Sequence, residues 1–303
     1  MTPDAPAPAL VEFENAHVQF GPQAVLRGIT FRVPRRQTVV VIGESGCGKT
    51  VTLKLIVGLL KASSGRVLFD GKVLADLNDK ELTKQRLRIG FLFQGAALFD
   101  SLSVYDNVAF GMRANRVDDK EIPERVHERL HEVGLPPGVE QKKPAELSGG
   151  MKKRVGLARA LALSPEIMLY DEPTTGLDPI MSDVINELII MARARHPMTS
   201  IVVTHDMKTA RRVADRVIML YPLTRLKPDE PQVLFDGTLA ELDQCADARV
   251  KSFVEGNARG RMEAMNDEFR ANGSDSHVEP PRELSLFRPL PGATPAKTDV
   301  PPT

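Results

Sequence analysis

The sequence GESGCGKT, from Gly43 to Thr50, sets the architecture expected of the rest of the chain. It fits the pattern G-x-x-x-x-G-K-[ST] of a phosphate-binding loop. Glycines give this loop backbone conformations that are closed to residues with a Cβ, so that successive N–H groups can turn toward one anion. Lys49 would add a positive charge that reaches the β- and γ-phosphates, and Thr50 would offer its hydroxyl to Mg²⁺.

The residues on either side of this loop are those that the motif requires. The apolar run Val39 to Ile42 indicates a buried parallel strand before it. The run Val51 to Leu60 indicates a buried helix whose N-terminus faces the phosphates. These flanks favour a nucleotide site over an incidental glycine-rich turn. The residues assigned to the nucleotide are Gly43, Glu44, Ser45, Gly46, Cys47, Gly48, Lys49, Thr50 and Val51.

The composition excludes several kinds of protein. The chain has 303 residues, and its 40 basic residues balance 40 acidic ones, which gives no support to a general electrostatic role on nucleic acid or membranes. Two cysteines, Cys47 and Cys245, do not make a disulfide framework. No apolar run reaches the roughly 18 residues that span a bilayer. The N-terminal sequence lacks the features of a signal peptide, so we expect a cytosolic protein that reaches a membrane only through a partner.

Apolar runs alternate with helical patterns along most of the chain. Residues 10–20 and 25–33 predict a small antiparallel sheet ahead of the phosphate loop. Later strands that alternate with helices imply a parallel sheet with right-handed crossovers. Helical spacing at 121–135 indicates that residues 95 to about 160 form an inserted helical subdomain. Further strands are predicted at 65–71, 89–93, 167–170, 200–203 and 216–221, and helices at 158–163, 182–195 and 207–215.

Polar side chains follow several of these strands directly. Open α/β sheets bind ligands beyond the carboxyl ends of their strands, so we expect these side chains to meet. Asp171 could hold Mg²⁺, and Glu172 could orient an attacking water or take its proton, although a solvated acidic turn is the alternative. His205 could bond a γ-phosphate and Gln94 could touch Mg²⁺ or the water, unless they are ordinary packed or surface residues.

The sequence LSGGMKKR, Leu147 to Arg154, places a second glycine pair before a helix. Ser148 and the N–H groups of Gly149 and Gly150 make a second anion site at a helix N-terminus. One ATP does not need two such sites from one chain. Either Ser148 only caps its helix, or this site serves the nucleotide of another copy.

Together these motifs resemble those of the ATP-binding cassette (ABC) ATPases. The order is GESGCGKT, Gln94, LSGGM, IMLYDEP, TTGLD and the Thr204-His205 pair, and the match covers roughly residues 11–240. The resemblance implies an α/β P-loop NTPase with a RecA-like parallel core, a small antiparallel β subdomain and an inserted helical subdomain. It also implies a head-to-tail homodimer with two ATPs, each held between the phosphate loop of one copy and LSGGM of the other.

Roles carry over from the family residue by residue. Lys49 and Thr50 would hold phosphate and Mg²⁺, with Asp171 and Gln94 also at the metal. Gln94 would sense the γ-phosphate and couple to a membrane partner. Catalysis would fall to Glu172 as base, with His205 clamping the γ-phosphate. Phe20 would stack on adenine. The residues that would serve the partner's ATP site are Ser148, Gly149, Gly150 and Asp178.

Within the family, the chain is similar to the Mla-type ATPases of MCE-linked lipid transporters. The segments 93–110 and 247–256 and the sequence from LSGGM to LDPI carry this likeness. It implies transport of phospholipids or related hydrophobic substrates, with two transmembrane permease subunits and an MCE-type substrate-binding protein as partners and no nucleic acid. The ATPase would be peripheral, on the cytoplasmic face of the inner membrane. A small-solute importer, or a soluble ABC protein acting on ribosomes or DNA, is the alternative.

The expected organisation has four parts. Residues 1–9 are rich in proline and alanine and are expected to be disordered, and 10–243 form the ATPase domain. Residues 244–265 form an extension that is expected to contact the other ATPase subunit. Its apolar face, Val250, Phe253 and Val254, could instead dock on its own domain. The proline-rich residues 266–303 are expected to be disordered.

Overall fold

The computed structural model of the protein describes residues 9–256. Of these, residues 9–255 belong to one compact unit. The expectations for residues 1–8 and for those after 256 lie outside the described part. Ala9, which we placed in the N-terminal stretch, already belongs to the first strand.

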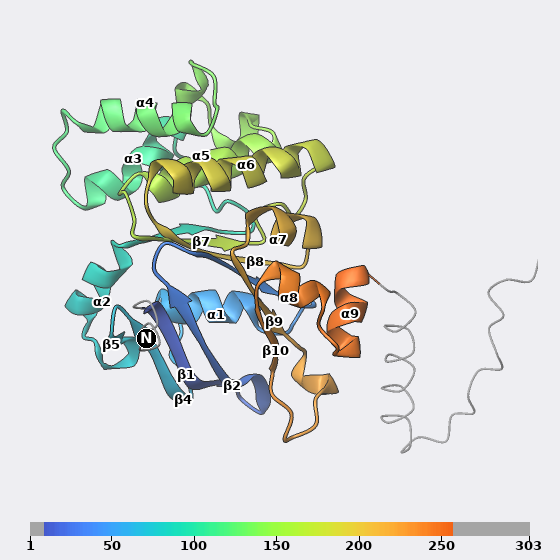
Figure 1. Ribbon diagram of the computed structural model, residues 1–303. Helices are drawn as coiled ribbons and strands as arrows, with labels where there is room; N and C mark the ends of the chain where they lie inside the picture. The colour runs from blue at the N-terminus through green and yellow to red at the C-terminus, as the bar shows by residue number, and fades with distance from the viewer. Residues whose placement is uncertain (1–8, 257–303) are drawn as a thin grey trace, which may run out of the picture. The chain divides into compact units, whose positions relative to one another are not determined.

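A six-stranded sheet forms the centre of the molecule, as Figure 1 shows. Its order is β10-β9-β3-β8-β7-β6, and every neighbouring pair is parallel except β10 with β9. The carboxyl ends of the five parallel strands therefore share one edge. The strands are β3 (Thr38–Ile42), β6 (Ile89–Leu92), β7 (Ile167–Asp171), β8 (Thr199–Thr204), β9 (Arg216–Leu220) and β10 (Val233–Gly237), which confirms the predicted parallel core.

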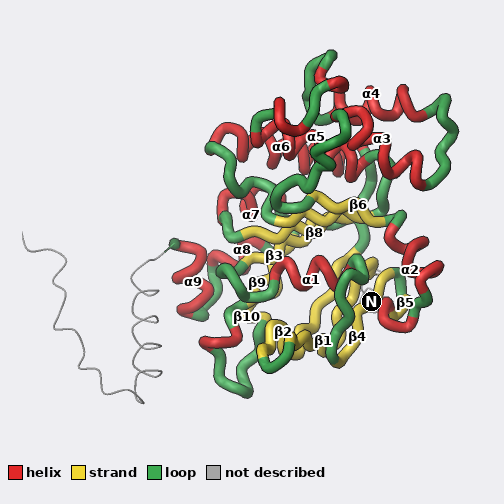
Figure 2. Tube along the Cα trace, turned by 180° about the vertical axis from the view of Figure 1, so that it is seen from behind, coloured by secondary structure: helices red, strands yellow, loops and turns green. Residues whose placement is uncertain are grey.

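A second, antiparallel sheet has the order β2-β1-β4-β5, which confirms the predicted antiparallel subdomain. Its strands are β1 (Ala9–Phe20), β2 (Gln23–Pro34), β4 (Ser64–Phe69) and β5 (Lys72–Val73). Helix α1 (Lys49–Ile56) lies between the two sheets (Figure 1, Figure 2). Leu53 and Ile56 of α1 belong to the apolar cluster that fills this space.

The other face of the six-stranded sheet carries a second apolar cluster. Val39 and Val41 point toward α1, whereas Val40 and Ile42 point into this second cluster. Both faces are thus covered, which is why β3 is apolar throughout instead of alternating. The helices of this layer are α3 (Val104–Ala114), α4 (Ile122–Glu132), α5 (Gly149–Leu161), α6 (Pro179–Arg195) and α7 (Met207–Val213).

Helix α2 (Asp79–Arg86) was not expected, and α3 was expected only as part of the helical subdomain at 95 to about 160. Both begin with a side-chain cap: Asn78 accepts a hydrogen bond from Glu81 N, and Ser103 accepts one from Asp106 N. An N-cap followed three residues later by an acidic residue is a recognisable start signal. Short 3-10 helices occur at Leu74–Asp76, Val139–Gln141, Pro144–Glu146 and Leu223–Arg225.

The chain beyond β10 returns to the same core through α8 (Leu239–Asp243) and α9 (Ala248–Glu255). Val250 is fully buried, and Phe253 and Val254 pack against the cluster that contains α5 and α6. The apolar face of α9 therefore docks on its own domain, and a contact of this region with another subunit stays a prediction.

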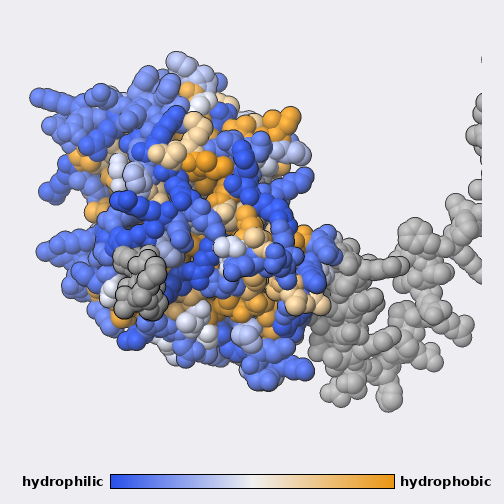
Figure 3. All heavy atoms as spheres, viewed as in Figure 1, coloured by the Kyte–Doolittle hydropathy of each residue, from blue (hydrophilic) through white to orange (hydrophobic). Residues whose placement is uncertain are grey.

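Polar residues cover much of the helical layer. In Figure 3 hydrophilic residues dominate the part of the face that lies over α3 and α4, and hydrophobic residues show mainly in the middle. Within residues 9–256, no helix is both long and apolar enough to cross a bilayer.

Candidate active site

The phosphate loop joins β3 to α1 at the carboxyl edge of the sheet. Gly43 and Gly48 have φ angles of 148° and 99°. A Cβ at Gly43 would overlap the carbonyl oxygen of Leu220, and one at Gly48 would overlap the side chain of Leu26. These two glycines are required by close packing as well as by backbone conformation.

Lys49 is buried and points back along the loop. Its Nζ donates hydrogen bonds to the carbonyl oxygens of Gly43, at 2.8 Å, and Glu44, at 3.0 Å. The same nitrogen lies 3.6 Å from Glu172 Oε1. The ammonium is therefore held between the loop and the carboxylate that would act on water.

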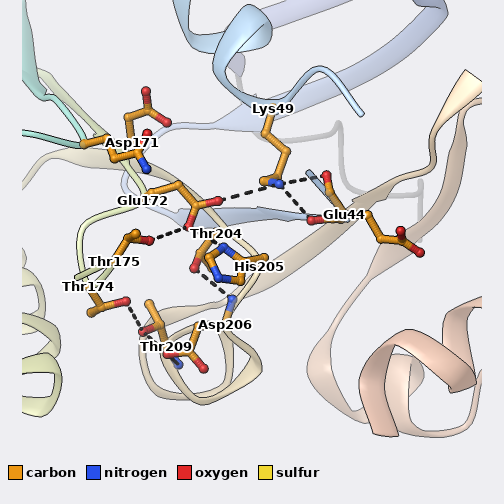
Figure 4. Close-up of polar contacts among 12 residues, drawn as sticks. Glu44, Lys49, Asp171, Glu172, Thr174, Thr175, Thr204, His205, Asp206 and Thr209 are labelled. Carbon is orange, nitrogen blue, oxygen red and sulfur yellow. Dashed lines mark hydrogen bonds and ion pairs between the residues drawn. The ribbon is translucent and has the colours of Figure 1, made fainter. Parts of the chain in front are cut away.

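Glu172 is the centre of a polar network, which Figure 4 shows. Its Oε2 lies 2.9 Å from His205 Nδ1 and accepts a hydrogen bond from Thr175 Oγ1 at 3.2 Å. Its backbone has a φ of 46°, a left-handed conformation that is uncommon for a residue with a Cβ. Held in this way, a buried carboxylate faces the phosphate loop with one oxygen on Lys49 and the other on His205.

His205 itself is half-exposed, and hydrogen bonds of Asp206 and Thr209 hold the turn that carries it. Asp206 caps α7 by accepting bonds from Lys208 N and Thr209 N. Its own N–H donates to Thr204 Oγ1 at 3.0 Å. Thr209 Oγ1 lies 3.2 Å from Thr174 Oγ1, which ties this turn to the segment after Glu172.

Asp171 lies apart from this network and fits a Mg²⁺ ligand. Among residues 9–256 its carboxylate receives one side-chain hydrogen bond, from Thr50 Oγ1 at 2.9 Å. Burial raises the pKa of Asp171, and the hydrogen bond from Thr50 and the charges of Lys54 and Lys153 only partly oppose that shift. A carboxylate and a hydroxyl side by side are the hard oxygen ligands that Mg²⁺ prefers, so the residues present fit the ion.

A cavity of 340 Å³ opens over the phosphate loop. Nine of the predicted residues meet there. Val25 of β2 also lines the cavity and was not foreseen. The predicted residues in its wall are Ser45, Gly46, Gly48, Lys49, Thr50, Val51, Gln94, Glu172 and His205.

Other predicted residues lie outside this wall. Gly43, Glu44 and Cys47 belong to the phosphate loop but do not line the cavity. Phe20, at the end of β1, is exposed and does not line it either. Ser148 caps α5 by accepting from Met151 N, and Asp178 caps α6 by accepting from Met181 N. The residues expected to serve a partner's ATP, Ser148, Gly149, Gly150 and Asp178, are all absent from the wall.

Two side chains far along the chain support the loop and were missed by sequence reasoning. Gln232 is buried, and its Nε2 donates to Cys47 O at 3.1 Å. Arg225 forms an ion pair of 2.8 Å with Glu44. Neither follows a strand end or belongs to a motif, so only the folded chain places them here.

A phosphate loop at the end of a parallel strand, with a buried carboxylate pair and a histidine at neighbouring strand ends, defines a P-loop ATPase. The family model described as ABC transporter matches residues 26–175. The chain belongs to the ABC transporter family and is an ATP-hydrolysing, ATP-binding subunit.

Two curated relatives and one solved structure illustrate the similarity. Over 83% of this chain and 92% of the relative, it is 38% identical to the intermembrane phospholipid transport system ATP-binding protein MlaF of Haemophilus influenzae. It is 39% identical to the chloroplastic protein TRIGALACTOSYLDIACYLGLYCEROL 3 of Arabidopsis thaliana, over 83% of this chain and 75% of that one. A dimeric ATP-binding cassette solved in a post-hydrolysis state with ADP and Pi has a TM-score of 0.65 and 32% identity, over 76% of this chain and 98% of that one.

Proposed function

We propose that this ATPase drives a membrane transporter of the Mla type, which moves phospholipids or related hydrophobic substrates. The observation that carries the catalytic part is the position of Glu172, with one carboxylate oxygen 3.6 Å from Lys49 Nζ and the other 2.9 Å from His205 Nδ1. The lipid substrate is supported by the names of MlaF and the Arabidopsis relative.

The hydrolytic step follows from these contacts. The N–H groups of the loop and the Lys49 ammonium would hold the β- and γ-phosphates. Glu172 would accept the proton of the attacking water, and His205 Nδ1 and Thr175 Oγ1 would keep its carboxylate oriented. Lys49 would stabilise negative charge on the transferring phosphoryl group.

Thr50 and Asp171 would hold Mg²⁺, with Gln94 close by in the cavity wall. Bound there, the ion would neutralise charge between the β- and γ-phosphates. The raised pKa of Asp171 is consistent with a carboxylate that is stabilised when the cation binds.

The subunit would work as a head-to-tail homodimer. Ser148, Gly149 and Asp178 lie outside the cavity of their own chain, at the N-termini of α5 and α6. Ser148 and the N–H groups of Gly149 and Gly150 would reach the ATP bound by a second copy, and Asp178 would lie in the loop that contacts that copy. ATP would close the dimer and hydrolysis would reopen it, and the dimeric form of the solved neighbour supports this arrangement.

The permease would dock beside Gln94. Phe99 and Phe110 are exposed, and their rings lie 4.6 Å apart. Paired aromatic side chains on a surface mark a protein contact. Two permease chains at this surface, with an MCE-type protein beyond them, would place the ATPase on the cytoplasmic face of the inner membrane.

Purification from membranes tests this proposal. The full-length protein, isolated in mild detergent, should bring membrane-spanning chains with it, and mass spectrometry of the complex should detect bound phospholipid. Phe110→Glu should lose the membrane chains and keep basal ATP hydrolysis. Leu59→Glu is the matched control, because Leu59 is similarly exposed but lies in the turn that follows α1.

Two results would contradict the proposal. Co-purification of nucleic acid or ribosomes in place of membrane chains would favour a soluble ABC protein. Membrane chains that carry a small polar solute and no lipid would favour a solute importer.

A further inference from the structure

Helix α5 carries a row of residues that the catalytic scheme does not use. Lys153, Gly156 and Arg159 are spaced by three, so they lie along one side of the helix. All three face the segment that follows β6 and contains Gln94. This segment will be called the Gln loop, residues 93–99.

The Gln loop has an unusual backbone. Ala96 and Ala97 have φ angles of 62° and 47°, so two consecutive residues with a Cβ are left-handed. Such a pair persists only when surrounding contacts hold it. Arg159 supplies these contacts, because its two terminal nitrogens donate to Ala96 O and Ala97 O, each at 2.7 Å.

Gly156 allows the loop to approach the helix. A Cβ at Gly156 would lie 3.2 Å from Ala96 Cβ and 3.0 Å from Leu92 Cδ1. These separations are tighter than ordinary packing, so the close contact between α5 and the loop depends on the missing side chain.

Lys153 makes the link that reaches the catalytic residue. Its buried Nζ donates to Gln94 O and, at 3.1 Å, to Glu172 O. Glu172 is itself left-handed, with a φ of 46°. One ammonium therefore joins the backbone of the loop to the backbone of the residue whose carboxylate faces Lys49.

We propose that Lys153 is a positioning residue for ATP hydrolysis, which sets the place of Glu172 relative to Gln94. A movement of the Gln loop is passed through Lys153 to the carboxylate, without a side chain of the loop touching it. This inference rests on the proposed role of Glu172 as the base.

The chemistry of the contact supports a rigid link. An ammonium bonded to two carbonyl oxygens forms charge-assisted hydrogen bonds, which are stronger than neutral ones. Burial lowers the pKa of Lys153, and the charges of Asp171 and Glu172 oppose that shift. The neighbouring Lys152 is the matched control, since its side chain forms no hydrogen bond or ion pair within residues 9–256.

The test compares kcat, KM and nucleotide affinity in the full-length protein. Lys153→Met keeps the length of the side chain and removes both donors. It should lower kcat by about 10- to 100-fold, the effect of a small misplacement of a catalytic group, and change the affinity for ATP by less than about threefold. Lys153→Arg, which keeps the donors, should recover most of the rate, and Lys152→Met should behave as the parent.

A double-mutant cycle separates positioning from general stability. If Lys153 acts through Glu172, Lys153→Met should change the residual single-turnover rate of Glu172→Gln by less than about twofold. Equal losses in both backgrounds, or a parental kcat in Lys153→Met, would overturn the inference alone. A parental rate in Glu172→Gln would overturn the proposed base and the inference with it. If Lys153→Met does not fold, Lys153→Gln takes its place in the same cycle.

Discussion

At the scale of single residues, Asp171 shows a conflict between stability and function. It is a buried carboxylate that receives, within residues 9–256, one side-chain hydrogen bond, from Thr50. Burial raises its pKa above the ordinary value of 3.8, so the folded protein disfavours the ionised form. Residues kept for a ligand often cost stability when the ligand is absent.

Asp171→Asn should therefore stabilise the nucleotide-free protein at neutral pH. A carboxyl whose folded pKa is raised contributes most stability below its unfolded pKa. That contribution is lost as the pH rises from about 3.8 through the folded pKa, so the destabilisation grows toward neutral pH. The amide keeps the shape and removes the charge. Thermal unfolding at pH 7 should show a Tm higher by about 2 °C or more.

The same variant should also lose most of the increase in Tm that Mg²⁺ and ATP give the parent. The parent should gain Tm when both are added, because a ligand of the folded state stabilises it. Asp171→Asn should gain much less, and should match the parent in Tm below about pH 3.8. A lower Tm for the variant at pH 7 without nucleotide would contradict this account of Asp171.

At the scale of elements, the connection between β9 and β10 supports the phosphate loop. Gln232, the last residue of this connection, is buried, and both the oxygen and the nitrogen of its side-chain amide form hydrogen bonds. Its Oε1 accepts from Arg27 N at 2.9 Å, and its Nε2 donates to Val25 O and Cys47 O, each at 3.1 Å. The antiparallel sheet and the phosphate loop are thereby joined through one side chain.

Gln232→Leu should destabilise the protein and weaken ATP binding together. Leucine fits the volume but leaves one buried carbonyl group, Cys47 O, and two part-buried groups, Arg27 N and Val25 O, without this partner. The buried group should cost about 1–3 kcal/mol and the part-buried groups less. The affinity for ATP should fall because Cys47 lies within the loop that holds the phosphates. Thermal unfolding and equilibrium nucleotide binding measure the two effects. Gln141→Leu is the control, since Gln141 is exposed, and a normal affinity in Gln232→Leu would refute the link.

Most of the fold could be predicted from sequence patterns that are as long as a strand or a helix. Continuous apolar runs identified the buried strands, and glycines marked the loop where backbone and ligand meet. Helix α2 was not predicted because its sequence, DKELTKQR, has no apolar face. The N-cap is its only start signal. Helix α6 begins at Pro179, earlier than expected, because Asp178 caps it and proline fits the first turn.

The site could be predicted where residues belong to the glycine-rich motif or follow strand ends. Lys49 belongs to the motif, Glu172 and His205 follow strand ends, and the structure brings the three together in one cavity. Lys153 and Gln232 act on backbone carbonyl groups, which every residue possesses, so no sequence pattern identifies their partners. The place of Phe20 on adenine and the assignment of Asp178 to a second copy remain predictions.

At the scale of the whole molecule, the two helix starts that can bind anions do not share a cavity. The phosphate loop opens into the cavity, and Ser148 does not. A head-to-tail dimer would bring the two into one composite site. Each ATP would then need residues from both copies.

Mixing two damaged variants tests this arrangement. Lys49→Ala and Ser148→Arg would each carry Glu172→Gln to prevent turnover. In their heterodimer one site has both defects and the other has none, so the intact site should retain one ATP per dimer through gel filtration. Each variant alone should retain none. A confirmed heterodimer without bound ATP would refute the composite site.

The order of strands in the central sheet also governs how the protein is made. Strand β3, which ends in the phosphate loop, pairs with β8 and β9, so Val40 lies between Val202 and Val217. At a translation rate of about 5–20 residues per second, roughly 10 to 30 s pass between synthesis of the loop and synthesis of both neighbours. A nascent chain halted before Thr199 therefore carries the complete phosphate-binding motif, but it lacks His205 of the cavity wall and both strands that pair with β3.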